Sequence, residues 1–188
     1  KIQIPNRRSQ YQIIFSKSEE QKYLKSEEEI SLISFATQEN LFYQEEISEQ
    51  EFINAGAEQR VYFYDDFHVV KLNGSIFYEY WLDYFNSLLI HNYFFQTTAY
   101  HFLGFKIINS HLFAVVKQEF IKANEVTNLS SVREVLLFSK FNNNRNNDYI
   151  NNELGIIFED LHDENVLSNN GILYFIDTIF YITAKFYL

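Results

Sequence analysis

The stretch FEDLHDENVLSNNGILYFIDT, from Phe158 to Thr178, is the most informative part of the sequence. It places Asp160 five residues before Asn165 and ends an apolar run on Asp177. The Asn-Asn-Gly segment at 169–171 tolerates the positive φ of a tight turn, so the short strands on either side are expected to pair. The three oxygen-bearing side chains are then expected to meet at one end of a hairpin.

These oxygens suit a divalent cation and a phosphate. Mg²⁺ usually binds one or two carboxylates together with phosphate oxygens and waters, and Asp177 and Asn165 can supply the protein's share. Asp160 is not needed for the metal and is free to orient an acceptor hydroxyl and take its proton. The stretch therefore predicts Mg²⁺, a phosphate and a hydroxyl acceptor in one place.

The motif D-L-H-D-E-N-V-L at 160–167, followed by F-I-D at 175–177, resembles the catalytic loop and metal-binding aspartate of the protein-kinase-like fold. It is most similar to the small kinase domains of polyvalent proteins and to the aminoglycoside and choline phosphotransferase branch. The resemblance implies ATP and Mg²⁺ as cofactors, Asp160 as a catalytic residue, and Asn165 and Asp177 as metal ligands. The alternative interpretation is an acidic loop that caps a hairpin.

The composition of the 188 residues fits one globular domain, or one with a small appendage. With 47% hydrophobic and 19% aromatic residues, the chain can bury a substantial core. No apolar run approaches the roughly 20 residues of a membrane span. Without cysteine or a secretory signal, a cytoplasmic protein with no membrane partner is expected. The net charge of -10 argues against nucleic acid as a partner.

Residues 1–50 are expected to form an N-terminal helical appendage. The Glu- and Lys-rich stretch from Ser16 to Ser48 suits two amphipathic helices, and the stretch from Ile2 to Phe15 could hold a short strand. A structural extension or docking segment is the simpler interpretation. An interaction domain that uses the acidic helices to bind a basic partner is the alternative.

Residues 51–118 are expected to form a small lobe made of a five-stranded antiparallel sheet and one helix. Three short β-branched and aromatic runs between Phe52 and Leu72 would supply three strands, with a turn at Asp65-Asp66. A helix from about Ile76 to Tyr93, capped by Ser75, would follow. The last two strands would be Tyr100 to Ile108 and His111 to Gln118.

The resemblance assigns the turn between the first two strands to the glycine-rich loop that covers ATP phosphates. Gly56 matches its middle glycine, and Val61 matches the valine that packs on adenine. Asn54 and Gln59 stand where the first and third glycines belong. A plain turn is the alternative interpretation.

Lys71 ends the strand V-V-K-L, where the resemblance implies a lysine that reaches the phosphates. An acid on the following helix should hold it, and Glu79 is favoured over Asp83. Ordinary surface charge is the alternative for all three residues.

Residues 119–188 are expected to form a reduced, mainly helical C-lobe that contains the catalytic loop. Glu119 and Phe120 fall at the hinge, where main-chain groups would meet adenine. A helix is expected from Ser130 to Phe141, followed by an Asn-rich loop from Asn142 to Asn152. His162 is expected either to hydrogen bond in the catalytic loop or to be structural.

The sequence thus predicts an α+β protein with a minimal, bilobal protein-kinase-like fold. The predicted function is ATP- and Mg²⁺-dependent phosphoryl transfer to a hydroxyl of a protein or a small molecule. Phe158 and Thr178 depart from the H-R-D and D-F-G patterns, and only eleven residues follow Asp177. Because of these departures and the poor glycine loop, a catalytically weak or inactive nucleotide-binding module, a pseudokinase, is the alternative.

Overall fold

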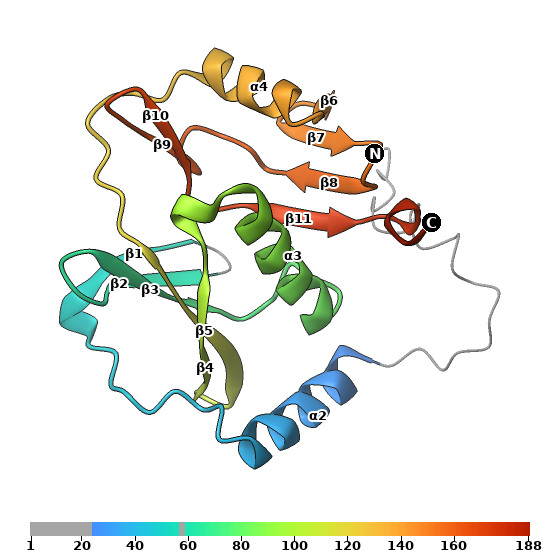
Figure 1. The fold of residues 1–188 in the computed structure, drawn as a ribbon. Helices are drawn as coiled ribbons and strands as arrows, with labels where there is room; N and C mark the ends of the chain where they lie inside the picture. Colours follow the sequence, from blue (N-terminus) through green and yellow to red (C-terminus); the bar gives the residue numbers. More distant parts are fainter. Residues whose placement is uncertain (1–23, 57–58) are drawn as a thin grey trace, which may run out of the picture.

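The computed structural model describes residues 24–56 and 59–188. Its first half contains a five-stranded antiparallel sheet with the order β1-β2-β3-β5-β4 (Figure 1). The five strands are β1 Phe52–Ala55, β2 Gln59–Phe63, β3 His68–Asn73, β4 His101–Ile108 and β5 His111–Glu119. The predicted sheet is therefore confirmed, and so is the turn at Asp65, whose carboxylate accepts the amide of Phe67.

The helix expected from Ile76 begins later, as α3 (Trp81–Phe94), and Ser75 does not cap it. Ser75 has a φ of 56°, which is not the extended conformation of a capping residue. The carboxylate of Glu28 instead accepts the amides of Trp81 (2.7 Å) and Leu82 (3.0 Å). A negative group from another helix thus satisfies the free N–H groups at the positive end of α3.

One helix, α2 (Lys25–Gln38), occupies the described part of the region where two were expected. Its Ala36 is fully buried, and the following chain at Leu41 and Tyr43 hydrogen bonds to Phe105 in β4. This part of the N-terminal region is therefore built into the fold. The strand expected from Ile2 to Phe15 lies outside the described residues.

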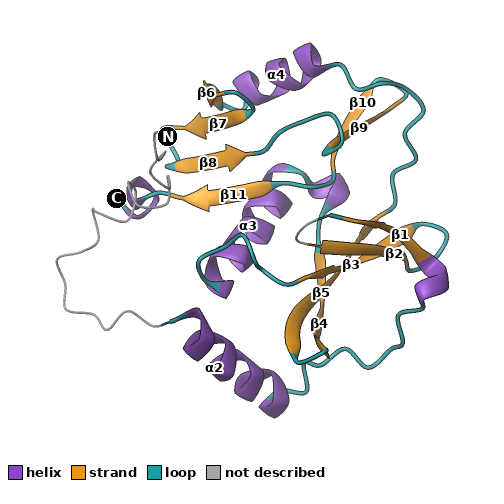
Figure 2. Cartoon of the chain, turned by 180° about the vertical axis from the view of Figure 1, so that it is seen from behind, coloured by secondary structure: helices purple, strands orange, loops and turns teal. Residues whose placement is uncertain are grey.

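The second half contains more strand than helix, so the prediction of a mainly helical part is wrong. It has one α-helix, α4 (Leu129–Phe138), which starts at the cap Asn128. A four-stranded sheet and a separate hairpin follow (Figure 2). Their strands are β6 Asn142–Arg145, β7 Asp148–Asn151, β8 Ile156–Glu159, β9 Val166–Asn169, β10 Ile172–Phe175 and β11 Ile179–Ile182. The hairpin predicted around Gly171 is confirmed as β9 and β10.

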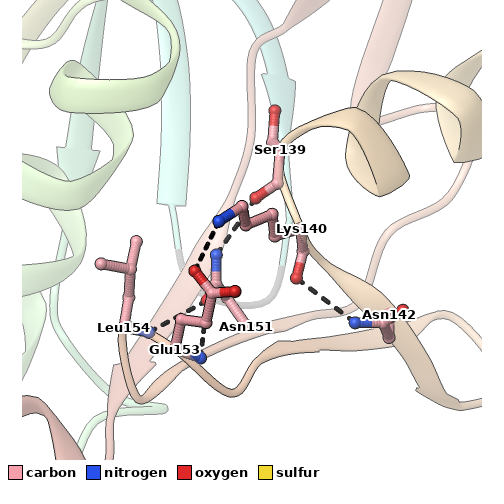
Figure 3. Close-up of polar contacts among 6 residues, drawn as sticks. All are labelled: Ser139, Lys140, Asn142, Asn151, Glu153 and Leu154. Atoms are coloured by element: carbon pink, nitrogen blue, oxygen red, sulfur yellow. Dashed lines mark hydrogen bonds and ion pairs between the residues drawn. The ribbon is translucent and has the colours of Figure 1, made fainter.

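The Asn-rich segment is not the loop that its composition suggested, because β6 and β7 pair as a hairpin. Asn146 takes the positive φ of its turn, at 48°. The buried amide of Asn151 donates to Ser139 O (3.1 Å) and accepts the amides of Glu153 and Leu154 (both 3.0 Å), as Figure 3 shows. Asparagine side chains in this segment hydrogen bond to the main chain and fix its turns. The polar composition is therefore compatible with ordered strands and does not indicate an irregular loop.

Helix α3 lies between the five-stranded sheet and β11 (Figures 1 and 2). At its start, Trp81 and Tyr84 pack in a core with Phe105 of β4. Near its end, Ile90 packs in a second core that includes Phe158 and Phe180. The helix therefore joins both halves. None of the helices among the described residues is both long and apolar enough to cross a membrane.

We predict that Gly104→Ala destabilises the protein by about 3 kcal/mol. Gly104 has a φ of 141°, and an added Cβ would overlap the carbonyl oxygen of Leu41. The change would strain the backbone and push the segment at Leu41 away from β4. Chemical denaturation followed by Trp81 fluorescence measures the effect.

Gly74→Ala is the matched control, because its added Cβ would meet the nearest atom, on Phe113, at 3.4 Å. Equal unfolding free energies for the two variants would contradict the predicted role of Gly104.

Candidate functional site

A cavity of about 670 Å³ lies between the five-stranded sheet and the segment that carries the catalytic-loop motif. Most of the predicted site residues line it, namely Gly56, Val61, Lys71, Glu119, Phe120, Asp160, His162, Asn165 and Asp177. Within the described residues, Glu79 and Asp83 are not part of this lining. The structure thus brings together residues that lie more than 100 positions apart in the chain.

Lys71 reaches across this cavity from β3. Its side chain is 4% exposed, and its Nζ donates to the carbonyl oxygen of Ile176 at 2.7 Å. The hydroxyl of Tyr100 donates to the same oxygen at 2.9 Å. The Lys71 Nζ also lies 5.3 Å from the centre of the Tyr100 ring, within cation–π range. Hydrogen bonds from β3 and from the residue before β4 therefore converge on Ile176, which directly precedes Asp177.

The acid that lies beside Lys71 in this cavity is Asp177, whereas Glu79, the acid expected to hold Lys71, is not among the described residues that line the cavity. Burial lowers the pKa of the Lys71 ammonium, and the Asp177 carboxylate opposes this by favouring the charged form. Glu79 acts elsewhere, because it raises the pKa of the neighbouring Tyr80 phenol, an effect second to burial. Since α3 begins only at Trp81, Glu79 lies in the turn before the helix rather than on its face.

The catalytic-loop motif forms a compact network of its own. The side-chain Nδ2 of Asn165 donates to Asp160 O (2.9 Å) and to His162 Nε2 (3.0 Å). These two contacts tie the Asn165 side chain to the first residues of the loop. His162 Nε2 also lies 3.7 Å from Asp160 Oδ2, and Asp160 itself has a φ of 57°. The bonds of Asn165 hold this uncommon backbone conformation.

Asn165 also holds the second proposed metal ligand in place. Its main-chain carbonyl accepts the amides of Ile176 (3.0 Å) and Asp177 (3.4 Å). Asn165 and Asp177 are therefore adjacent despite their twelve-residue separation, which the β9–β10 hairpin closes. Because Nδ2 of Asn165 is used within the loop, its Oδ1 is the end left for a cation.

Gln59, at the start of β2, makes the most direct contact with the proposed metal aspartate. Its Nε2 donates a hydrogen bond to Asp177 Oδ2. This residue stands where the resemblance placed the third glycine of the loop. A glycine has no side chain and could not make this hydrogen bond. The contact therefore depends on the glutamine that this chain has at the position.

A buried histidine lies behind the site and connects α3 to the residue after Asp177. His91 is fully buried, and its Nε2 donates to Thr98 O at 2.8 Å. Its Nδ1 therefore accepts the hydroxyl of Thr178, also at 2.8 Å. Burial lowers the pKa of His91 to about 3, because the charged imidazolium would lose its hydration. The ring is thus neutral near pH 7.

At the predicted hinge, the main chain is partly engaged. Glu119 is aligned with His68 in the β3–β5 pairing, and the amide of Phe120 donates to Phe67 O at 2.7 Å. Phe120 therefore lies against the cavity with its N–H already bonded. An adenine edge would have to meet other main-chain groups of this segment.

The donor set fits Mg²⁺ only when a ligand completes it. Within the part of the chain that the structure describes, no cluster of three or more His, Asp or Glu side chains could hold a metal alone. Asp177 and Asn165 offer one carboxylate and one amide oxygen. Mg²⁺ commonly accepts such a small protein share when phosphates and waters supply the remaining ligands.

Another cavity, of about 800 Å³, lies between α4, the end of α3 and the β9–β10 hairpin. Its described lining contains Glu125 and Glu134 but no Lys or Arg. A polyphosphate would meet only negative charge there. The cavity that contains Lys71 is therefore the better candidate for a phosphate ligand.

Sequence reasoning missed three contributors to the site. The carbonyl of Ile176 could not be foreseen because every residue has one. Tyr100 and His91 were embedded in apolar runs without a ligand-like spacing. The available signal was Thr178, a polar residue in place of the Phe of D-F-G, whose hydroxyl bonds to His91.

The comparison with known protein families gives a match over most of the chain. Residues 25–184 match the family described as Serine/Threonine/Tyrosine Kinase found in polyvalent proteins. Because the match covers most of the sequence, the chain belongs to this family. No curated protein and no solved structure matches the chain. The predicted resemblance to the polyvalent kinase domains is thus confirmed.

We predict that the free energy of unfolding falls as the pH is lowered from about 6.5 toward about 3, partly through His91. In this range the unfolded histidine binds a proton and the folded one does not, so lower pH favours unfolding. The contribution approaches 1.4 kcal/mol per pH unit, roughly the cost of one pKa unit. His91→Gln should make the slope shallower by this amount, as measured by urea denaturation at several pH values.

His111→Gln is the control, because His111 is an exposed histidine. If His91→Gln and His111→Gln change the slope equally, the neutral buried state of His91 is wrong.

Proposed function

We propose that the chain is an ATP- and Mg²⁺-dependent phosphotransferase that acts on a hydroxyl of a protein or a small molecule. The observation that supports this best is the meeting of Lys71 and Asp177 on one cavity, joined through the Ile176 carbonyl. A buried cation beside a carboxylate is the arrangement that a metal-bound polyphosphate requires. Membership of a kinase family supports the same function.

Lys71 would leave the Ile176 carbonyl, or share its protons, to bind phosphate oxygens. Asp177 and the Oδ1 of Asn165 would hold Mg²⁺, and Tyr100 would keep the Ile176 carbonyl in place. Bound ATP would supply the phosphoryl group, and Mg²⁺ would neutralise the negative charge that develops on the phosphate oxygens during transfer. The site is shielded from bulk water around Lys71, so these charges act more strongly than they would in solvent.

Asp160 would orient the acceptor hydroxyl and take its proton. Its side chain is 63% exposed, so an acceptor can approach it from solvent. His162 and Asn165 would fix the loop around it through their mutual hydrogen bond. Val61 and Gly56 would contact the nucleotide from the sheet, and Glu119 and Phe120 would border its base.

The two halves of the structure would be the two lobes of a kinase-like protein. In this proposal residues 51–118 form the N-lobe, residues 119–188 form a reduced C-lobe, and residues 1–50 form an N-terminal extension. The family match starts at residue 25 and therefore includes α2, which makes α2 the part of this extension that belongs to the kinase-like unit. A cytoplasmic location is part of the same proposal.

A nucleotide-binding module without catalysis is the second candidate. The contact of Gln59 with Asp177 favours it, because a side chain already engages one of the two carboxylate oxygens that a metal would use. Binding of Mg²⁺-ATP in calorimetry, with no phosphate transferred to water, to an acceptor or to the chain itself, would favour this candidate.

We predict that Asp160→Ala and Asp177→Ala each lower phosphoryl transfer by about 1,000-fold or more while leaving the fold intact. Asp160→Ala removes the proton acceptor, and Asp177→Ala removes the charged metal ligand. Transfer from γ-labelled ATP to the chain itself or to water measures the loss, and circular dichroism reports on the fold.

Asp163→Ala is the matched control, since Asp163 is an exposed acid in the same loop that lies outside the cavity lining. The assignment is wrong if ATP consumption is undiminished in both cavity variants.

A further inference from the structure

The strand register directs Gln59 toward the proposed metal site. Gln59 is paired with Asn73, and Val61 is paired with Lys71, in the antiparallel β2–β3 ladder. Directly paired residues of such a ladder extend their side chains to the same face of the sheet. All four residues line the cavity. Gln59 therefore lies on the same face as Lys71, two pairs further along the ladder.

The main chain at Gln59 is fixed, so only its side chain can withdraw from Asp177. Its carbonyl accepts the amide of Gly56 at 2.9 Å, and its pairing with Asn73 ends the ladder. The side chain spans to a residue 118 positions away and donates to Asp177 Oδ2. This contact joins the sheet to the segment that follows the hairpin.

We propose that Gln59 is a built-in competitor for the divalent cation at Asp177. A cation that approaches Asp177 Oδ2 along the lone pair that accepts this N–H can coordinate it only after the amide turns away. The amide of Gln59 is neutral. It therefore bonds to the Asp177 carboxylate without neutralising its negative charge, which remains to attract a cation. This inference rests on the proposed function, because it takes Asp177 as the metal ligand.

The expected size of the effect follows from the bond that must be broken. A hydrogen bond to a charged group contributes enough to change a binding constant by about tenfold or somewhat more. A glutamine side chain rotates freely about several bonds, so the amide can turn away without moving β2. Cation binding should therefore be weakened and not abolished.

Binding of Mn²⁺ to the full chain in the presence of a saturating nonhydrolysable ATP analogue, measured by electron paramagnetic resonance, tests the proposal, because the site completes the metal's ligand set only with phosphates. Gln59→Ala removes the amide, and Gln59→Asn retains it on a side chain one methylene shorter. We expect both variants to bind Mn²⁺ about tenfold more tightly than the unsubstituted chain. Gln50→Ala, which removes an exposed glutamine outside the cavity, should leave the affinity unchanged.

Asp177→Asn distinguishes failure of this inference from failure of the proposed function. If Asp177→Asn abolishes Mn²⁺ binding but Gln59→Ala binds no more tightly than the unsubstituted chain, the competitor role is overturned and the metal site stands. If Asp177→Asn leaves Mn²⁺ binding unchanged, or the unsubstituted chain and Gln59→Ala both fail to bind, the metal assignment and the competitor role are both overturned. Thermal unfolding confirms that each variant is folded.

Discussion

The carbonyl oxygen of Ile176 is the point on which the site depends. It receives one hydrogen bond from Lys71 in β3 and another from Tyr100 just before β4. The amide of the same residue donates to the main chain of Asn165. One peptide segment thus joins the sheet, the catalytic-loop motif and Asp177. It fixes the proposed phosphate-binding cation, Lys71, relative to the proposed metal-binding carboxylate of Asp177.

Tyr100 and His91, the buried groups that bond to this segment, are neutral. Lys71 and Asp177 therefore supply the charges at this point of the cavity. Burial raises the pKa of the Tyr100 phenol well above its usual range and lowers that of His91, so both are uncharged near pH 7. Each still hydrogen bonds to the segment around Asp177 through an uncharged donor or acceptor. The interior therefore positions the site without adding charges that would compete with a phosphate or a cation.

Local signals were sufficient for much of the fold and of the candidate site. The Asn-Gly turn predicted the β9–β10 hairpin, and short runs rich in β-branched and aromatic residues predicted the five-stranded sheet. The spacing of Asp160, Asn165 and Asp177 predicted a shared site, and the structure places them on one cavity. These features depend on residues close in sequence, whose geometry is limited by the turn that joins them.

The errors arose where distant residues decide the local structure. Helix α3 starts late because Glu28 of another helix caps it, and no neighbour of Ser75 reveals this. The Asn-rich segment pairs as strands, and the side-chain amide of Asn143 closes the turn between them by donating to Asn146 O. The contact between Gln59 and Asp177 joins the two halves, so neither stretch alone predicts it.

The structure of the chain with a nonhydrolysable ATP analogue and Mg²⁺ tests the central claim most directly. The account predicts the metal between Asp177, the Oδ1 of Asn165 and the phosphates, with the Lys71 ammonium on a phosphate oxygen. A nucleotide bound elsewhere, or one whose phosphates lie away from Lys71 and Asp177, would contradict it.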